Sequence, residues 1–197
     1  DTGMLHANCY IVHDEKIGII IDPCVETNKI KDYIIEQNIQ LECIFVTHAH
    51  VDHILYLDAL REEFSIYAYI HEKENEFLTN SVFNGSSLFG MNKTFKKAEK
   101  TLIDKEKIKI GSMDINIIWT PGHSPGGISI LINDALFSGD TLFYESIGRT
   151  DLGKGDYQEL MHSLKEKLFS LENQIVVYPG HGKNTTIGHE KANNIYI

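Results

Sequence analysis

Seven consecutive residues, Thr47 to His53, contain three imidazoles and one carboxylate: His48, His50, Asp52 and His53. The preceding Ile44-Phe45-Val46 is typical of the end of a buried strand, and residues 54–60 are typical of an amphipathic helix. Side chains two apart in an extended backbone point to the same side, so His48 and His50 can meet one ion. Imidazole and carboxylate ligands suit zinc, iron or manganese. The segment therefore predicts a metal site where a strand meets a helix, as is usual in α/β sheets.

Three more candidate ligands each follow an apolar strand directly after a glycine: His123, Asp140 and His181. Glycine allows the sharp turn that places a ligand at the end of a strand. One histidine after a strand is more often a structural residue. Three such strand ends in a chain that already has the 48–53 cluster favour a shared metal centre.

Seven ligands are too many for one tetrahedral ion, which uses four positions. We therefore expect two divalent ions about 3.5–4 Å apart. Zinc is the expected metal, with iron and manganese as alternatives. In this hypothesis His48, His50 and His123 hold the first ion. Asp52, His53 and His181 hold the second, and Asp140 bridges them.

Such a centre could carry out hydrolysis. A dication lowers the pKa of bound water from about 16 to about 7, so hydroxide forms at neutral pH and can attack a carbonyl carbon. Asp52 is the candidate catalytic residue, which would orient the nucleophile and accept its proton. The non-catalytic alternative is a metal-stabilised scaffold. Structural metal sites are closed, however, whereas seven ligands around two ions leave room for water.

Composition narrows the class of protein. The length of 197 residues predicts a single domain over 1–197, and 42% hydrophobic and 23% charged residues are ordinary for a soluble globular chain. The net charge of −10 argues against nucleic acid and an anionic membrane as partners. The scattered cysteines predict buried, reduced thiols, and we see no signal peptide or membrane-spanning run. The expected location is the cytoplasm. The cysteines are Cys9, Cys24 and Cys43.

Hydrophobic periodicity predicts alternating strands and helices around these residues. A charged helix is expected to begin at His71. Residues 79–91 mix polar and apolar side chains, which fits either a lid over a pocket or a loop packed into the core. Apolar strands ending in Pro-Gly-His occur at 118–123 and 176–181, and this repetition suggests two similar halves.

The motifs together resemble those of the metallo-β-lactamase-fold hydrolases, and within them the short, single-domain members of the glyoxalase II (hydroxyacylglutathione hydrolase) group. The resemblance runs almost end to end. It implies an α+β fold, a four-layer αβ/βα sandwich in which two mixed β-sheets pack face to face with helices outside and metals at one edge. It also implies hydrolysis of an S-acyl glutathione, such as S-lactoylglutathione. The segments that carry it are 8–10, 22–23, 47–53, 120–126, 138–143, 148–151 and 179–182.

The chain departs from the long glyoxalase II type in the region that holds glutathione. We expect no C-terminal helical domain with basic residues here, and Asp151 and Lys183 stand near the positions of two glutathione-contacting tyrosines. Arg149 and Lys183 are the candidate substrate-binding residues for an acidic small molecule, although both also fit solvated loop charges. The sequence thus supports a small-molecule thioester better than it supports glutathione as the carrier, and it gives no oligomeric state.

Two other activities occur on the fold that the sequence resembles. Persulfide dioxygenases share much of the 148–151 loop and use one iron, held by residues that match His48, His123 and Asp140. Other ester or lactone hydrolases are the remaining alternative.

Overall fold

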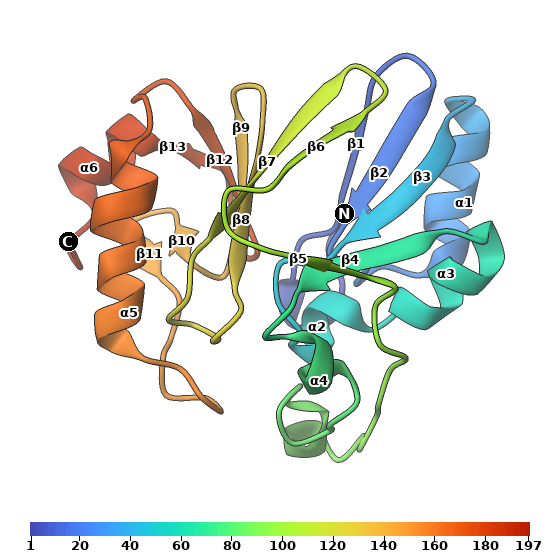
Figure 1. The fold of residues 1–197 in the computed structure, drawn as a ribbon, viewed down its shortest axis with the longest axis horizontal. Coiled ribbons are helices and arrows are strands. Elements are labelled where there is room, and N and C mark those ends of the chain that lie inside the picture. The colour runs from blue at the N-terminus through green and yellow to red at the C-terminus, as the bar shows by residue number, and fades with distance from the viewer.

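Two β-sheets lie face to face at the centre of the molecule, and helices cover the outer side of each (Figure 1). This arrangement is seen in the computed structural model, which describes residues 1–197. The expected α+β fold, with two mixed sheets between helices, is confirmed.

The first sheet has five strands in the order β1-β2-β3-β4-β5. Only the β1–β2 pair is antiparallel, so β3, β4 and β5 are each reached by a crossover connection. The connections to β3 and to β4 contain helices that cover the outer face of the sheet. The strands are β1 (Tyr10–His13), β2 (Ile17–Ile21), β3 (Gln40–Phe45), β4 (Tyr67–His71) and β5 (Lys100–Leu102), and the helices are α1 (Thr27–Glu36), α2 (Val51–Ile54), α3 (Leu57–Phe64) and α4 (Asn75–Leu78).

The second sheet has six strands in the order β13-β12-β9-β8-β7-β6, and only β9 and β12 are parallel. A separate hairpin pairs β10 with β11. The helix α5 continues through a π turn (Ser163–Lys167) into a 3-10 turn (Leu168–Ser170). These elements are β6 (Lys107–Ile110), β7 (Met113–Trp119), β8 (Ile128–Ile132), β9 (Ala135–Gly139), β10 (Leu142–Phe143), β11 (Ser146–Ile147), β12 (Val176–Pro179), β13 (Thr185–Thr186), α5 (Tyr157–His162) and α6 (Ile187–Asn193).

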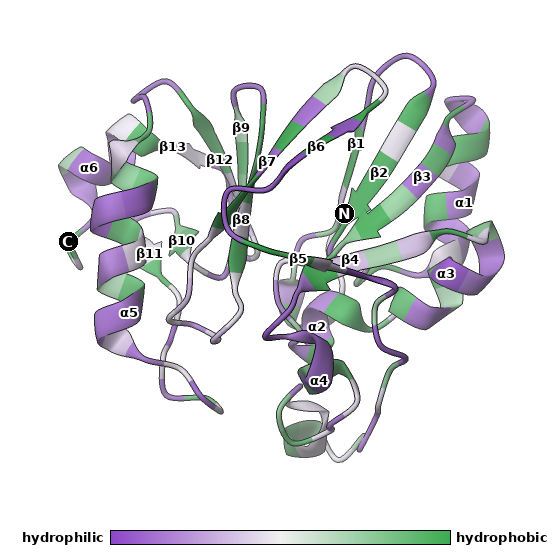
Figure 2. Ribbon diagram, in the orientation of Figure 1, coloured by the Kyte–Doolittle hydropathy of each residue, from purple (hydrophilic) through white to green (hydrophobic).

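Alternation along the strands divides the apolar side chains among three cores. In β2, Ile19 and Ile21 face the second sheet, whereas Ile20 faces α1 and α3. On α1, Ile30 and Ile34 are four residues apart and both are buried against the first sheet. Figure 2 shows hydrophobic strands in both sheets beside helices with mixed faces. Burial of these apolar faces holds the two sheets together and so determines which strand ends lie close to one another.

Three sequence expectations are wrong. The helix after the 48–53 cluster is split into α2 and α3, because the Tyr56 N–H bonds to the Pro23 carbonyl, 3.0 Å away, outside the helix. No charged helix begins at His71, which ends β4, and Glu74 is fully buried. The two Pro-Gly-His segments follow β7 and β12 of the same sheet, so they do not mark two halves.

The three cysteines are buried and free, as the sequence predicts. None of the helices has the length and hydropathy that a bilayer crossing requires.

Candidate metal centre

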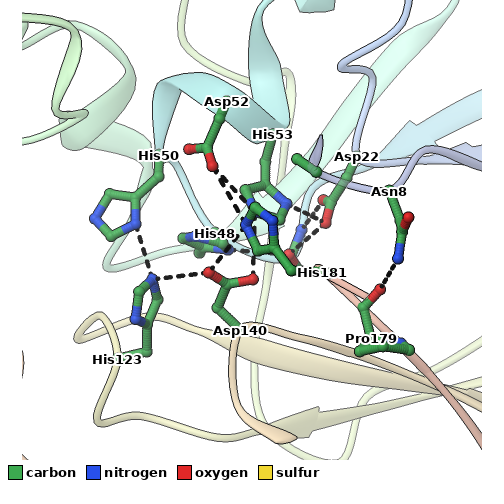
Figure 3. Close-up of polar contacts among 12 residues, drawn as sticks. Asn8, Asp22, His48, His50, Asp52, His53, His123, Asp140, Pro179 and His181 are labelled. Carbon is green, nitrogen blue, oxygen red and sulfur yellow. Dashed lines mark hydrogen bonds and ion pairs between the residues drawn. The ribbon is translucent and has the colours of Figure 1, made fainter. Parts of the chain in front are cut away.

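The seven candidate ligands converge at one edge of the two sheets, where several strands end (Figure 3). The segment after β3 supplies His48 and His50, and α2 supplies the next two ligands, Asp52 and His53. Strands β7, β9 and β12 of the second sheet lead to the remaining three, which are His123, Asp140 and His181. The centre therefore lies between the sheets and needs both of them.

Glycine is required before three of the ligands. Gly122 precedes His123 with a φ of 137°, and a Cβ there would lie 2.3 Å from the Leu160 backbone. Gly139 precedes Asp140 with a φ of 50°, in the left-handed region that glycine adopts without strain. Gly180 precedes His181 for a different reason, because a Cβ there would collide with the Asp140 carboxylate and lie 2.7 Å from Cε1 of His53. The expected turn is therefore present at Gly122 and Gly139, whereas Gly180 is needed for space.

The ligand atoms form three groups of three, of which one, made of His48, His53 and Asp140, connects the other two. In the first of those two, His50 Nδ1 lies 2.9 Å from His123 Nε2, and a ring nitrogen of His48 is within 4.8 Å of both. In the second, His181 Nε2 lies 3.3 Å from Asp52 Oδ2 and 3.3 Å from His53 Nε2. These two groups have the members that the sequence suggested for two ions, and the binding of an ion by either group stays a prediction.

Asp140 lies between the two groups. Its Oδ2 is 3.5 Å from His123 Nε2 and 3.5 Å from His181 Nε2, and its Oδ1 is 3.3 Å from His53 Nε2. One carboxylate thus reaches a member of each trio, which is the position that a bridging ligand needs.

Two buried atoms at the centre have no hydrogen-bond partner: His48 Nε2 and Asp140 Oδ1. Buried polar atoms are nearly always paired, so an unpaired acceptor calls for a physical reason. A cation between the trios would pair both atoms and neutralise the two carboxylates. The residues present therefore fit a metal-binding centre.

Electrostatics acts differently on the individual ligands. Burial by itself lowers the pKa of His53 and of His181, but nearby carboxylates raise both, so without a cation these two imidazoles favour a proton in its place. Burial lowers the pKa of His48 well below its usual value, and the neutral imidazole is the form that binds metal. Burial by itself raises the pKa of Asp140, but the positive charge of His53 lowers it well below its usual value. Asp140 is therefore held as a carboxylate.

A cavity of about 400 Å³ opens above the centre, and the centre contributes His50, Asp52, His123, Asp140 and His181 to its lining. Residues 82–85, 88 and 89 form part of its wall. Residues 79–91 are in part packed into the protein, and their action as a lid stays a prediction. Asn84 is buried and its carbonyl accepts a bond from the Val51 N–H at 2.8 Å, whereas Leu88 and Phe89 are exposed at the mouth.

The family model of the metallo-beta-lactamase superfamily matches residues 2–181 of the chain. The chain belongs to the metallo-beta-lactamase superfamily. Membership supports an enzyme of the metallo-hydrolase class. The chain is 37% identical over 199 residues to the probable metallo-hydrolase YqgX of Bacillus subtilis, covering all of this chain and 94% of the relative. It is 33% identical to the hydroxyacylglutathione hydrolase GloC of Haemophilus influenzae, with 96% and 92% covered.

Solved structures of the superfamily match the fold closely. The B3 metallo-beta-lactamase BLEG-1 superposes with a TM-score of 0.94 at 38% identity, covering 99% of this chain and 96% of that one. TTHA1623, solved in a di-iron-bound form, gives 0.88 at 29% identity, with 99% and 97% covered. ETHE1 from Myxococcus xanthus gives 0.81 at 28% identity, with 96% and 78% covered.

Asp22 is not itself a candidate ligand, but it holds His53 and the neighbouring Thr47 in place. The sequence did not reveal this role. Its Oδ1 accepts a bond from the Thr47 N–H at 2.8 Å, and its Oδ2 accepts bonds from Thr47 Oγ1 at 2.7 Å and His53 Nδ1 at 2.9 Å. A proton fixed on Nδ1 leaves Nε2 of His53 free to bind an ion. Asp22 follows an apolar strand, the same signal that identified Asp140.

Glu74 is the second supporting carboxylate that the sequence did not reveal. It is fully buried, and it accepts bonds from the Ala49 N–H at 3.0 Å and the Gly126 N–H at 2.8 Å. It thereby joins the loop between His48 and His50 to the loop after His123. No local signal could have found it, because it lies in a charged run typical of an exposed helix.

The two predicted substrate-binding residues are placed differently. Arg149 lines the cavity, but its guanidinium forms two bonds to the Asp151 carboxylate, at 2.6 and 2.8 Å. Lys183 does not line the cavity, and its Nζ lies 3.6 Å from the ring centre of Tyr144. Contact of either residue with substrate stays a prediction.

Proposed function

We propose that the protein is a metal-dependent hydrolase of thioesters, with S-acyl glutathiones such as S-lactoylglutathione as the first substrates to test. The observation that carries this proposal is the pair of ligand trios that share Asp140 and open into the cavity. GloC, a relative at 33% identity, is named a hydroxyacylglutathione hydrolase. In this reaction water adds to the thioester carbonyl, the C–S bond breaks, and a carboxylic acid and a thiol are released.

The proposed centre holds two divalent ions. His48, His50 and His123 would hold one, Asp52, His53 and His181 the other, and Asp140 both. Zinc is the first candidate for this nitrogen-rich set, and iron and manganese suit it as well. The di-iron form of TTHA1623 supports iron as the main alternative.

When bound, such ions make water acidic and polarise a carbonyl oxygen. The protein's own residues position the reacting groups. Asp52 lines the cavity, and the proposed role of its carboxylate is to orient the attacking water and accept its proton. Asp22 holds His53 in one tautomer, and the His123 Nδ1–H donates to the Arg149 carbonyl at 2.7 Å, which directs its Nε2 to the centre. These bonds keep the ligands preorganised.

A substrate panel with metal analysis tests the proposal. Purified protein loaded separately with zinc, iron or manganese would be given S-acyl glutathiones, simpler thioesters, lactones and a β-lactam. The β-lactam is included because of the similarity to BLEG-1. We expect thiol release with two equivalents of metal, and a loss of at least 100-fold in Asp140→Ala. The exposed Asp114→Asn is the control and should retain wild-type rates. Failure of every thioester would refute the proposal.

The second candidate function is a persulfide dioxygenase with a single iron at His48, His123 and Asp140. Two observations favour this second function: the 148–151 loop, and the structural match to ETHE1. Oxygen uptake on glutathione persulfide, measured with metal content, separates the two. A mononuclear iron protein that consumes oxygen and hydrolyses no thioester would establish the second function.

We further propose a small molecule as the partner, rather than nucleic acid or a membrane, and the cytoplasm as the location. The net charge of −10 supports the first part, and three free, buried cysteines support a reducing compartment.

A further inference from the structure

The cavity wall facing the metal centre is apolar. Residues 79–91 contribute Val82, Phe83, Leu88 and Phe89, and the β10–β11 hairpin contributes Phe143 and Ile147. These two segments lie on opposite halves of the molecule, so the wall exists only in the folded chain. A substrate's acyl group that enters the cavity would therefore contact these apolar side chains over much of its surface.

The apolar side chains at the mouth of the cavity are also exposed. Val82 is 66% exposed and Leu88 68%, and Leu5 and Phe89 are each about half exposed on the same rim. Leaving four large apolar side chains in water around one opening costs free energy on the order of 25 cal/mol per Å² of exposed apolar surface. Apolar side chains exposed around a cavity are typical of ligand-binding grooves.

The basic groups near the cavity are occupied. Arg149 is the one lysine or arginine in the lining, and both of its bonds go to Asp151. Lys183 lies over Tyr144, and Lys154, which is not part of the lining, has its Nζ 4.9 Å from the ring centre of Phe83. The lining thus offers no unpaired lysine or arginine to the two carboxylates of glutathione, whereas nine of its 19 residues are hydrophobic and can contact an acyl group.

We propose that this cavity selects its thioester by an apolar acyl chain, which packs against Leu88, Phe89 and Phe143, and that the charged groups of the thiol carrier contribute little. The inference rests on the proposed thioesterase function and names its substrate class. A straight-chain acyl group longer than four carbons is the expected substrate, in preference to the short and polar lactoyl group.

The test compares chain length at constant carrier. Hydrolysis of S-acetyl-, S-butyryl-, S-hexanoyl-, S-octanoyl- and S-lactoylglutathione would be measured with metal-loaded protein. Each methylene that packs on the wall raises kcat/KM by about two- to fourfold, the upper value being that of full burial. S-octanoyl-N-acetylcysteamine, which lacks both carboxylates, should be hydrolysed within about threefold of S-octanoylglutathione.

A charge placed on the wall should remove the chain-length effect. Leu88→Asp is expected to lower kcat/KM for the octanoyl ester at least tenfold more than for the acetyl ester. The matched control is Ile35→Asp, which introduces the same charge at a side chain of α1 that is 67% exposed and outside the cavity. This control should keep the wild-type ratio.

Binding of unreactive thioethers makes the inference testable apart from catalysis. The affinity of metal-loaded protein for S-methyl- to S-octylglutathione should rise with chain length in wild type and in Ile35→Asp, but not in Leu88→Asp. Equal affinities along the series, a preference for S-lactoylglutathione, or a loss above 100-fold without the carboxylates would overturn the inference. Chain-length-dependent binding without any thioester hydrolysis would instead support the apolar site and refute the proposed function.

Discussion

Replacement of Asp22 by asparagine tests whether a buried carboxylate sets the protonation of a metal-ligating histidine. Asp22 accepts three bonds, two from Thr47 and one from Nδ1 of His53. An asparagine has one accepting oxygen. If that oxygen stays on the Thr47 N–H, its NH₂ group faces His53 Nδ1, and the imidazole proton must move to Nε2. This is the nitrogen that faces Asp140 and His181.

The expected cost follows from this exchange of donor and acceptor. A buried donor that faces another donor costs about 1–3 kcal/mol, and loss of such a supporting bond typically lowers metal affinity by about 10–100-fold. We therefore expect one of the two ions in Asp22→Asn to bind about 10–100-fold more weakly, which corresponds to about 1.4–2.7 kcal/mol. The ion at His48, His50 and His123 should bind within about threefold of wild type.

Competition between metal-free protein and a chromogenic chelator gives the two affinities, and thermal unfolding of the metal-free form reports the fold. Asp114→Asn is the matched control, because Asp114 is exposed and lies outside the centre. If Asp22→Asn bound both ions with wild-type affinity while its unfolding temperature fell, the asparagine NH₂ group would face the Thr47 N–H and its oxygen would accept from His53 Nδ1, and the tautomer reasoning would be refuted.

Three further predictions concern stability. Glu74→Gln places an amide N–H against a backbone N–H at Ala49 or Gly126, so it should destabilise the metal-free fold by about 1–3 kcal/mol in denaturant unfolding; an unchanged midpoint would contradict this. Zinc at about 100 times its Kd should stabilise the protein by about 2.7 kcal/mol per ion and raise Tm by about 5–11 °C, reversibly with a chelator, and no shift would argue against binding to the folded state. Burial raises the pKa of the Cys43 thiol to about 12, so the folded state keeps a proton that the unfolded state loses above about pH 9. Stability should therefore fall between pH 9 and 12, and by less in Cys43→Ala, when unfolding is measured across that range.

The sequence by itself determined the strands, the residues at their ends and the chemistry of those residues. Period-two alternation in β2 and helical spacing in α1 are local properties, so they could be interpreted without coordinates. The ligand types at His123, Asp140 and His181 were likewise visible, because each directly follows an apolar run. These local signals were sufficient to predict strands and the candidate ligands at their ends, whereas the two packed sheets were implied by the resemblance to a known fold.

Only the tertiary structure decided which charged groups are buried and which are already paired. Glu74 joins loops 25 and 52 positions away in the chain, and Asp22 reaches His53 across 31 positions. Within its own neighbourhood, Glu74 is one acid in a charged run. Arg149 likewise could be interpreted as a free cation until its pairing with Asp151 was seen. Periodicity records which face of an element is apolar, whereas desolvation and pairing depend on what other elements bring to that face.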